Sequence, residues 1–517
     1  MKNTISNLNN NLNQNLEKKI ANYKFEKIIT YGIIIAIAVS IFLRIYNLEQ
    51  KNPWFDEVYS WKISNLSFTE IIFKTGQDIH PPLYYFTLKI WMSIFGDSLF
   101  AIRMLSVMFG LLSMFFIFKI CKIIFNNNLP VLLVLLLYAV SPLNIYYSQE
   151  VRMLNMNLFL CLGSVYFFIL NLKSYNLRNS LFYCLFTFLS FYTHYFALLI
   201  FITQILIIFF EFRSNTIDKN KFKTYLKIFS IPVILYIPWI PYFITQITKG
   251  QPWRTSMSFI EILESVYKYF KEIFFSPYVH FEDKFVFWFS TVLTVIIMVV
   301  FLIRVIKFYK SDSKNDRVLF YVSLLFLIPL LIALLISMKQ SILLSRYLSI
   351  IVPYLLIAKV ALYFKMKMKY KIYVLVLILI ISSVYGVLIH NRNDFKNNDY
   401  RRITTYIQEN DFNPGKDLVI VEPHYMGWMV EYEVKQGNVN LTNPVDFGWN
   451  LNQIKDSIKI KSNDNLKSFW MILDYSSMEK NDYDNFNNFV DSLGYKSIAS
   501  KTFYVIPEKV SVTHYVK

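Results

Sequence analysis

Apolar runs of about 18 residues or more recur along most of this 517-residue sequence, and each is long enough to cross a hydrocarbon core of roughly 30 Å. Hydrophobic residues make up 55% of the chain and charged residues only 17%, which is too apolar for a soluble protein of this length. The sequence therefore predicts a polytopic α-helical membrane protein with about eleven transmembrane helices. The expected spans are about Ile28–Tyr46, Leu99–Ile120, Pro130–Tyr147, Met153–Leu172, two short crossings within 180–212 broken near Thr193-His194-Tyr195, Ile228–Ile247, Phe285–Arg304, Val318–Ser337, Tyr347–Phe364 and Ile372–Ile389.

The basic residues give the expected orientation. The net charge is +18, but Lys and Arg gather in short loops between the apolar runs, which is the pattern of cytoplasmic loops rather than of a nucleic-acid surface. We therefore expect a multi-pass plasma membrane protein with a cytoplasmic amino terminus and an extracytoplasmic carboxy terminus. The Asn- and Lys-rich residues 1–27 are expected to form a partly disordered cytoplasmic tail. The first run lacks a small-residue cleavage site and is expected to be a retained anchor.

The remaining segments divide into outer loops and a C-terminal domain. Residues 28–390 form the expected transmembrane domain, with outer loops at 48–81 and 248–284 that contain interfacial helices. In the second loop, Ser258 and Glu261 have the spacing of a capping box at the start of an amphipathic helix. Residues 391–517 are polar and predict a small soluble α/β domain with helices near Tyr400–Gln408 and Asn485–Leu493. The expected strands are Asp417–Val421, Phe469–Leu473 and Thr502–Ile506.

Two adjacent carboxylates follow the first span, in the loop Asn52-Pro53-Trp54-Phe55-Asp56-Glu57. Asn52 could cap a helix whose first residue is Pro53, and acidic side chains in the first turn favour the positive end of the helix dipole. Neighbours in a helix point about 100° apart, so we expect one carboxylate to face a reacting atom and the other to cap or position. Asp56 and Glu57 are the candidate catalytic residues.

Further candidates for binding lie at the predicted outer ends of other spans. His80, which precedes a double proline, could donate a hydrogen bond to a phosphate oxygen, and Tyr84 and Tyr85 would suit a sugar or lipid chain. The prolines could instead simply fix an extended chain. Arg103 lies inside an apolar run, where burying a cation costs free energy unless an anion is beside it. Glu150, Asp56 or a ligand phosphate could be that anion. The remaining candidates are Arg152, which could form an exposed salt bridge with Glu150, and Arg346-Tyr347, which could contact lipid headgroups.

Several of these stretches together resemble the membrane glycosyltransferases of family 39, in the GT-C superfamily, akin to protein O-mannosyltransferases and the lipid A aminoarabinose transferase. The resemblance covers roughly residues 28–360. It is carried, in this order, by Leu48-Glu49-Gln50 to Asp56-Glu57, His80-Pro81-Pro82-Leu83-Tyr84, Arg103-Met104-Leu105-Ser106, Ser148-Gln149-Glu150-Val151-Arg152, and Arg346-Tyr347 with Pro353.

The resemblance implies a GT-C fold, a polyprenyl-phosphate sugar donor, and a glycan, lipid or protein acceptor outside the membrane. Asp56 matches the family's catalytic acidic position, Glu57 its companion, and Glu150 the acidic position of the second outer loop. Independently of the family, sugar transfer from a lipid phosphate needs a base for the acceptor hydroxyl and positive charge for the departing phosphate. Asp56 could be the base, with inversion, and Arg103, Arg152 or Arg346 could supply the charge. No cofactor is then required, although a divalent metal between Asp56 and Glu150 is the alternative.

Two other functions remain open at this point. A lipid-linked-substrate transporter or flippase would also place charges inside the membrane, but the paired interrupted helices of an inverted repeat are not evident. A membrane anchor with a partner-binding outer domain leaves Asp56, His80 and Arg103 unexplained.

Overall fold

The computed structural model describes residues 2–50, 52–249, 255–275, 302–303, 305–306, 313–365, 400–410, 412–413, 417–422, 426–437, 451–463, 466–474, 480–505 and 508–517. The chain divides into two compact units. The first unit contains Met1–Tyr46, Thr69–Thr87 and Arg103–His390, and the second contains Asn47–Phe68, Leu88–Ile102 and Asn391–Lys517. The second unit therefore combines parts of the first outer loop with the C-terminal part of the chain.

Six helical stretches within the described residues are long and apolar enough to cross a membrane, or seven if a bent pair forms one span. This confirms a multi-pass membrane protein, and the predicted number of eleven spans stays a prediction. Four of the stretches lie within single helices: Tyr23–Ile45 of α1 (Lys2–Ile45), α5 (Leu99–Ile124), α8 (Leu154–Lys173) and Asn315–Ser337 of α15 (Lys314–Ser337). The fifth, Lys219–Thr248, is formed by α11 (Lys219–Tyr236), η1 (Ile237–Trp239) and α12 (Ile240–Lys249). The sixth, Ser345–Phe364, is formed by α16 (Ser345–Leu348), η2 (Ser349–Ile351) and α17 (Val352–Lys365).

The breaks between helices follow the sequence closely. Helix α6 (Asn128–Ala139) and α7 (Pro142–Ser148) are bent by 56°, and Pro142 lies at the start of α7, where a proline is well tolerated. The ambiguous stretch at 180–212 forms two helices, α9 (Leu177–Phe191) and α10 (Ala197–Arg213), with the break near His194 as predicted. The spans expected at 285–304 and 372–389 lie outside the described residues, apart from 302–303.

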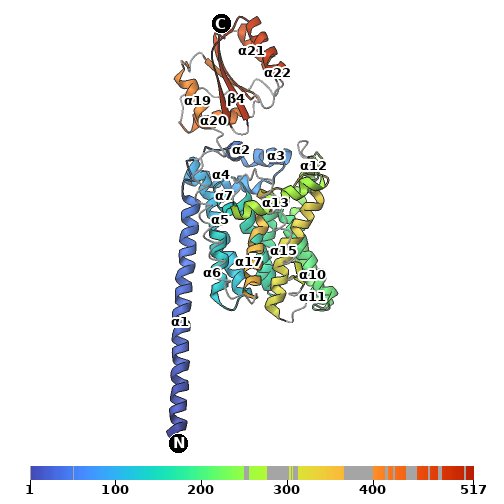
Figure 1. Ribbon diagram of the computed structural model, residues 1–517. Helices are drawn as coiled ribbons and strands as arrows, with labels where there is room; N and C mark the ends of the chain where they lie inside the picture. Colours follow the sequence, from blue (N-terminus) through green and yellow to red (C-terminus); the bar gives the residue numbers. More distant parts are fainter. Residues whose placement is uncertain are drawn as a thin grey trace. The chain divides into compact units, whose positions relative to one another are not determined.

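The amino-terminal helix is longer than the sequence suggested. Helix α1 begins at Lys2, so residues 2–27 continue the first span as a helix and are not the partly disordered tail that we expected. The tail contains good helix formers such as Leu16, Glu17 and Lys18, and extending an existing helix is far easier than nucleating one. In Figure 1, α1 runs beside α6, which it contacts.

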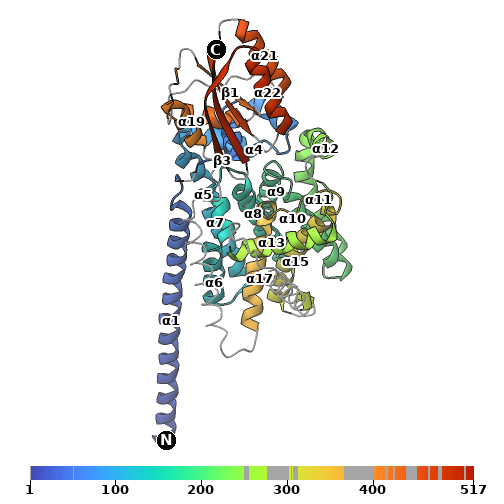
Figure 2. The ribbon, with the colours of Figure 1, turned by 45° about the horizontal axis from the view of Figure 1, so that its top comes forward.

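Helices α8 and α9 approach each other unusually closely in the first unit (Figure 2). A Cβ atom on Gly163 would lie 2.3 Å from Cδ1 of Phe186. One residue further along, Ser164 Oγ lies 2.8 Å from Thr187 Oγ1, and Gln204 of α10 donates to Ser164 Oγ at 3.1 Å. Small residues and interhelical hydrogen bonds are what hold helices together in lipid, where no hydrophobic difference drives them.

Replacing Gly163 with Leu should therefore destabilise the first unit. The new side chain needs space that the Phe186 ring occupies, and overpacking of this kind costs about 1–3 kcal/mol. We expect a lower thermal unfolding midpoint in nanodiscs, with a smaller drop for Gly163→Ala. Equal midpoints for the wild type and Gly163→Leu would show that α8 and α9 accommodate the larger side chain without any loss of stability.

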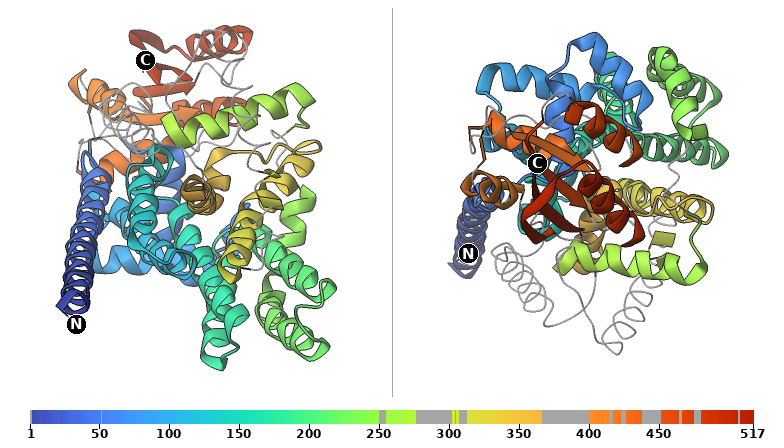
Figure 3. Two further views of the ribbon diagram at one scale, coloured as in Figure 1. Left: turned by 60° about the horizontal axis from the view of Figure 1, so that its bottom comes forward. Right: turned by 90° about the horizontal axis from the view of Figure 1, so that it is seen from above.

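Helix α13 (Phe259–Phe275) confirms the predicted capping box. Ser258 N donates to Glu261 Oε2 at 2.6 Å, and Glu261 N donates to Ser258 Oγ at 3.3 Å. In Figures 2 and 3 this yellow-green helix runs across the long helices of its unit. Its inner face packs on α16, where Tyr269 donates to the Leu348 carbonyl at 3.1 Å.

The second unit contains a four-stranded sheet in the order β1-β2-β4-β3. Strand β1 (Asp417–Glu422) pairs in parallel with β2 (Ser468–Asp474), and β4 (Glu508–Val516) pairs antiparallel with both β2 and β3 (Lys496–Val505). The expected strands and the helices α19 (Tyr400–Glu409) and α22 (Lys480–Ser492) are confirmed. The helix α21 (Leu451–Asn463) and strand β4 were not predicted.

The two faces of this sheet are covered by different helices (Figure 1). Phe469 and Met471 of β2 join a core with Ile458 of α21 and Phe486 of α22. Trp470, which points the other way, makes an edge contact with Tyr406 of α19. This alternation is the period of two that a strand covered on both faces shows.

Glu422 gives the second unit a pH-dependent stability. Burial raises the pKa of its carboxyl to about 7 from 4.5. Between these values the folded chain holds the proton and the unfolded chain does not, so the free energy of unfolding falls as the pH rises through this window. Glu422→Gln should remove this fall, giving higher amide protection of β1 and β2 than the wild type at pH 8 and equal protection at pH 4. The same pH dependence in both proteins would contradict this assignment.

Candidate active site

The acidic pair lies at the start of α2 (Phe55–Ser64), in the second unit. The N-cap is Trp54, so the predicted cap at Asn52 is wrong and the helix begins two residues later than expected. The local reason is Glu57, whose carboxylate accepts a hydrogen bond from the Trp54 backbone N–H at 3.3 Å. This bond supplies a partner for a backbone N–H at the start of the helix, where the helix itself offers none.

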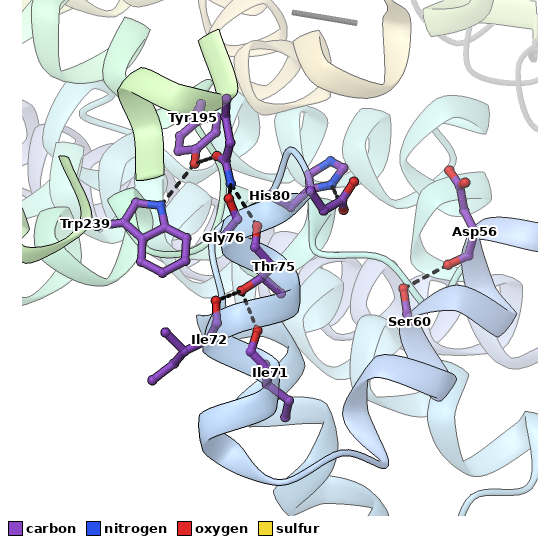
Figure 4. Close-up of polar contacts among 11 residues, drawn as sticks. Asp56, Ser60, Ile71, Ile72, Thr75, Gly76, His80, Tyr195 and Trp239 are labelled. Atoms are coloured by element: carbon purple, nitrogen blue, oxygen red, sulfur yellow. Dashed lines mark hydrogen bonds and ion pairs between the residues drawn. The ribbon is translucent and has the colours of Figure 1, made fainter. Parts of the chain in front are cut away.

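Asp56 and Glu57 have different environments. The Glu57 side chain is 1% exposed and holds the helix start, which suits a positioning residue more than a catalytic one. Asp56 is half-buried, and its backbone carbonyl accepts a hydrogen bond from Ser60 Oγ at 2.9 Å, which Figure 4 draws. The helix therefore fixes the backbone of Asp56 and leaves part of the residue accessible to water. Of the two, Asp56 is the better candidate for the base.

The His80 loop lies in the first unit, between α3 (Phe68–Gln77) and α4 (Leu83–Phe95). Gln246 of α12 donates to the Thr75 carbonyl at 2.8 Å and to the Gly76 carbonyl at 3.2 Å. Tyr195 donates in turn to Gln246 Oε1 and accepts the Trp239 Nε1–H at 3.0 Å (Figure 4). These contacts anchor the loop to residues about 120 to 170 positions further along the chain.

The His80 ring is part of an aromatic cluster. It is 5% exposed, its Nδ1 lies 3.6 Å from Asp78 Oδ2, and its centroid lies 5.6 Å from that of His194. His194 lies 5.0 Å from the Tyr347 ring and accepts the Phe196 N–H at its Nδ1, 3.2 Å away. A neutral His194 therefore carries its proton on Nε2, which makes that nitrogen a donor.

A cavity of about 400 Å³ opens beside this cluster within the first unit. Its walls are mainly aliphatic and come from α10, α12 and α15, while imidazole, phenol and amide groups supply the polar atoms. A site with apolar walls and a few placed polar groups suits an amphiphile, whose chain is apolar and whose head accepts hydrogen bonds. The lining residues are Ile79, His80, His194, Tyr195, Phe196, Leu198, Leu199, Ile202, Phe243, Gln246, Ile247, Ile332, Ile336, Gln340, Ile342 and Tyr347.

Two of the predicted binding residues, His80 and Tyr347, thus line one cavity. Arg346 is half-buried on α16, with its guanidinium carbon 5.1 Å from the centroid of the Tyr347 ring. Tyr84, predicted to contact a sugar or lipid chain, is fully buried and packs edge-to-face on Tyr85 with centroids 5.8 Å apart. Its position is that of a core residue.

Arg103, Glu150 and Arg152 are all buried in the first unit. Ser106 Oγ donates to the Arg152 carbonyl at 3.4 Å, which brings the Glu150–Arg152 segment against α5. Arg103 is one turn before Ser106 and so shares that face of α5. The predicted pairing of Arg103 with Glu150 stays a prediction, but the fold brings their segments together. Among the described residues, no group of three or more His, Cys, Asp or Glu is arranged to hold a metal ion.

Sequence reasoning missed His194 and Arg44. Arg44 is fully buried near the end of α1, where it donates to Ser40 Oγ at 2.5 Å, Ser148 Oγ at 3.1 Å and the Ala139 carbonyl at 3.1 Å. Its own carbonyl accepts from Gln149 at 3.1 Å, so it fixes the segment that leads to Glu150. A charge inside an apolar run was the available signal for Arg44. The available signal for His194 was the presence of a histidine at a predicted helix break.

The chain is similar to known proteins in one region of its sequence and in its fold. Residues 79–242 match the family model described as dolichyl-phosphate-mannose-protein mannosyltransferase. No curated protein matches the chain. The fold is similar to that of ArnT from Cupriavidus metallidurans bound to undecaprenyl phosphate, with a TM-score of 0.56 at 10% identity, covering 94% of this chain and 98% of that one.

Two further solved structures have the same fold. ArnT in the apo state gives a TM-score of 0.55 at 11% identity, covering 94% of this chain and 98% of that one. The apo oligosaccharyltransferase of Archaeoglobus fulgidus gives 0.52 at 12% identity, covering 89% and 71%. The chain therefore has the fold of these solved structures, and the region that matches the family model contains the His80 loop and the Glu150 segment.

Proposed function

We propose that this protein transfers a sugar from a polyprenyl-phosphate carrier to a hydroxyl group of an acceptor on the outer face of the membrane. The observation that carries the proposal is the cavity of the first unit, in which aliphatic walls adjoin His80, His194 and Tyr347. The apolar walls suit the polyprenyl chain, and the ring N–H and phenol O–H groups suit its phosphate. The similarity to an ArnT structure that contains undecaprenyl phosphate supports the same type of donor.

The proposed reaction is a single displacement with inversion. The acceptor oxygen attacks the anomeric carbon, Asp56 takes the hydroxyl proton, and the bond from that carbon to the phosphate oxygen breaks. The bonding electrons leave with the phosphate as the polyprenyl phosphate departs. His80 would donate a hydrogen bond to that phosphate, and the positive charge of Arg103, Arg152 or Arg346 would stabilise it. No metal ion is needed in this scheme.

Binding of the carrier can be tested before the sugar is known. Native mass spectrometry of the full chain in nanodiscs should show that undecaprenyl phosphate binds. Undecaprenol should displace it only weakly, because the alcohol lacks the phosphate. Substitution of His80 by Ala should reduce binding of the phosphate and leave the weak binding of the alcohol unchanged. Equal binding of both lipids would contradict a phosphate-recognising site. A transporter would instead move the lipid across vesicles without forming a covalent product.

A further inference from the structure

Helix α2 packs against a helix of the C-terminal part of the chain, α20 (Gly427–Lys435), within the second unit. Lys62 Nζ lies 2.7 and 2.6 Å from the two carboxylate oxygens of Glu431. The two residues are 369 positions apart in the sequence. Both side chains are partly shielded, at 32% and 15% exposure, so this pair is held more firmly than a fully solvated one.

Aromatic side chains extend this contact toward the acidic pair. Phe55 stacks on Trp428 with centroids 6.0 Å apart and planes at 13°, and Tyr59 lies 5.8 Å from the same indole. Phe55 directly precedes Asp56, and Tyr59 follows it by three residues. The Trp428 ring therefore contacts the turn of α2 that carries Asp56.

The far end of α2 is fixed as well. Trp61 meets the Tyr432 ring edge-on at 5.1 Å and donates its Nε1–H to Asp97 Oδ2 at 3.1 Å. Gln436, just after α20, donates to the carbonyl of the same Asp97 at 3.1 Å. The contacting residues of α20, Trp428, Glu431, Tyr432 and Lys435, follow the i, i+3, i+4, i+7 spacing of one helix face.

We infer that the C-terminal part of the chain is a positioning element for the reaction, in which α20 fixes the orientation of α2 and thereby of Asp56. This rests on the proposed function of Asp56. The acidic pair is on a helix of only ten residues, and such a short helix alone does not hold a carboxylate to the fraction of an ångström that proton transfer requires. The stacked indole and the ion pair supply that constraint from a folded sheet domain. Glu431, Trp428 and Lys62 act through α2 and need not touch the substrate.

A charge exchange tests the ion pair. In the full chain in nanodiscs, Lys62→Glu and Glu431→Lys should each lower kcat about tenfold and change the donor KM by less than about twofold, because the donor cavity belongs to the first unit. The double variant restores an opposite-charge pair and should return kcat to within about threefold of the wild type. Lys459→Glu, a charge reversal on the exposed face of α21, is the matched control and should leave kcat unchanged.

The stacking contact gives a second test that does not depend on charge. Trp428→Ala should lower kcat, whereas Trp428→Phe, which keeps a ring over Phe55, should retain most of it. Amide protection of β1 and β2 reports whether the sheet remains folded in each variant. If Trp428→Ala and the charge reversals keep kcat within twofold, or if the double variant stays as slow as the single ones with the sheet intact, the inference is wrong. Absence of sugar transfer by the wild type would instead reject the proposed function.

Discussion

Asp56→Asn is expected to lower kcat for sugar transfer by about 10²- to 10⁴-fold, the usual contribution of a general base. The amide has the size of the carboxylate but cannot accept the proton of the acceptor hydroxyl. The substitution leaves α2 intact, because the helix start is held by Glu57 and the Trp54 N–H, and the Ser60 bond uses the backbone carbonyl of Asp56. The donor KM should change little. Initial rates with a labelled polyprenyl-phosphate sugar measure both quantities.

The matched control is Glu70→Gln, which neutralises an exposed carboxylate of α3 in the same outer loop. It changes the loop charge by the same amount without removing the proposed base. Full activity of Asp56→Asn would reject the catalytic assignment, and an equal loss in Glu70→Gln would mean that the net charge of the loop matters rather than residue 56.

Ile202→Trp is expected to raise the donor KM about tenfold or more by filling the cavity. Ile202 lines the cavity from α10 and is 39% exposed, so a larger side chain can be accommodated there without disrupting the helix packing. An indole would occupy space that the polyprenyl chain needs, and a tenfold loss corresponds to about 1.4 kcal/mol of binding free energy. The measurement is the donor KM together with retention of undecaprenyl phosphate in native mass spectrometry.

Leu206→Trp is the matched control for this substitution. Leu206 lies one turn further along α10, is 42% exposed and is not among the residues that line the cavity. It should keep the wild-type KM. If both variants bind the lipid as the wild type does, the polyprenyl chain occupies another site.

Features that depend on neighbouring residues could be predicted from the sequence. The membrane helices follow from the length of apolar runs, the start of α13 follows from Ser258 and Glu261, and α22 covers most of the helix expected near Asn485–Leu493. Each depends on contacts a few residues apart in the chain. The helix start at Trp54 was missed because Asn52 has the stronger intrinsic capping preference, whereas Glu57 decided the outcome.

The parts that could not be predicted depend on residues far apart in the sequence. Nothing local indicates that Lys62 meets Glu431, or that the first outer loop folds with the C-terminal part of the chain. His194 was named only as a helix break, since its proximity to His80 and Tyr347 exists only after the helices assemble. Apolar patterns determine which residues are buried but not which helices become neighbours.

The most direct test of sugar transfer is mass spectrometry of glycans and glycolipids from cells that lack the protein and are supplied with the wild type or with Asp56→Asn. We predict that one glycan or glycolipid carries an added sugar with the wild type alone, and that the polyprenyl-phosphate sugar accumulates with Asp56→Asn. Identical glycan and glycolipid masses in the two samples, with both proteins present in the membrane, would contradict it.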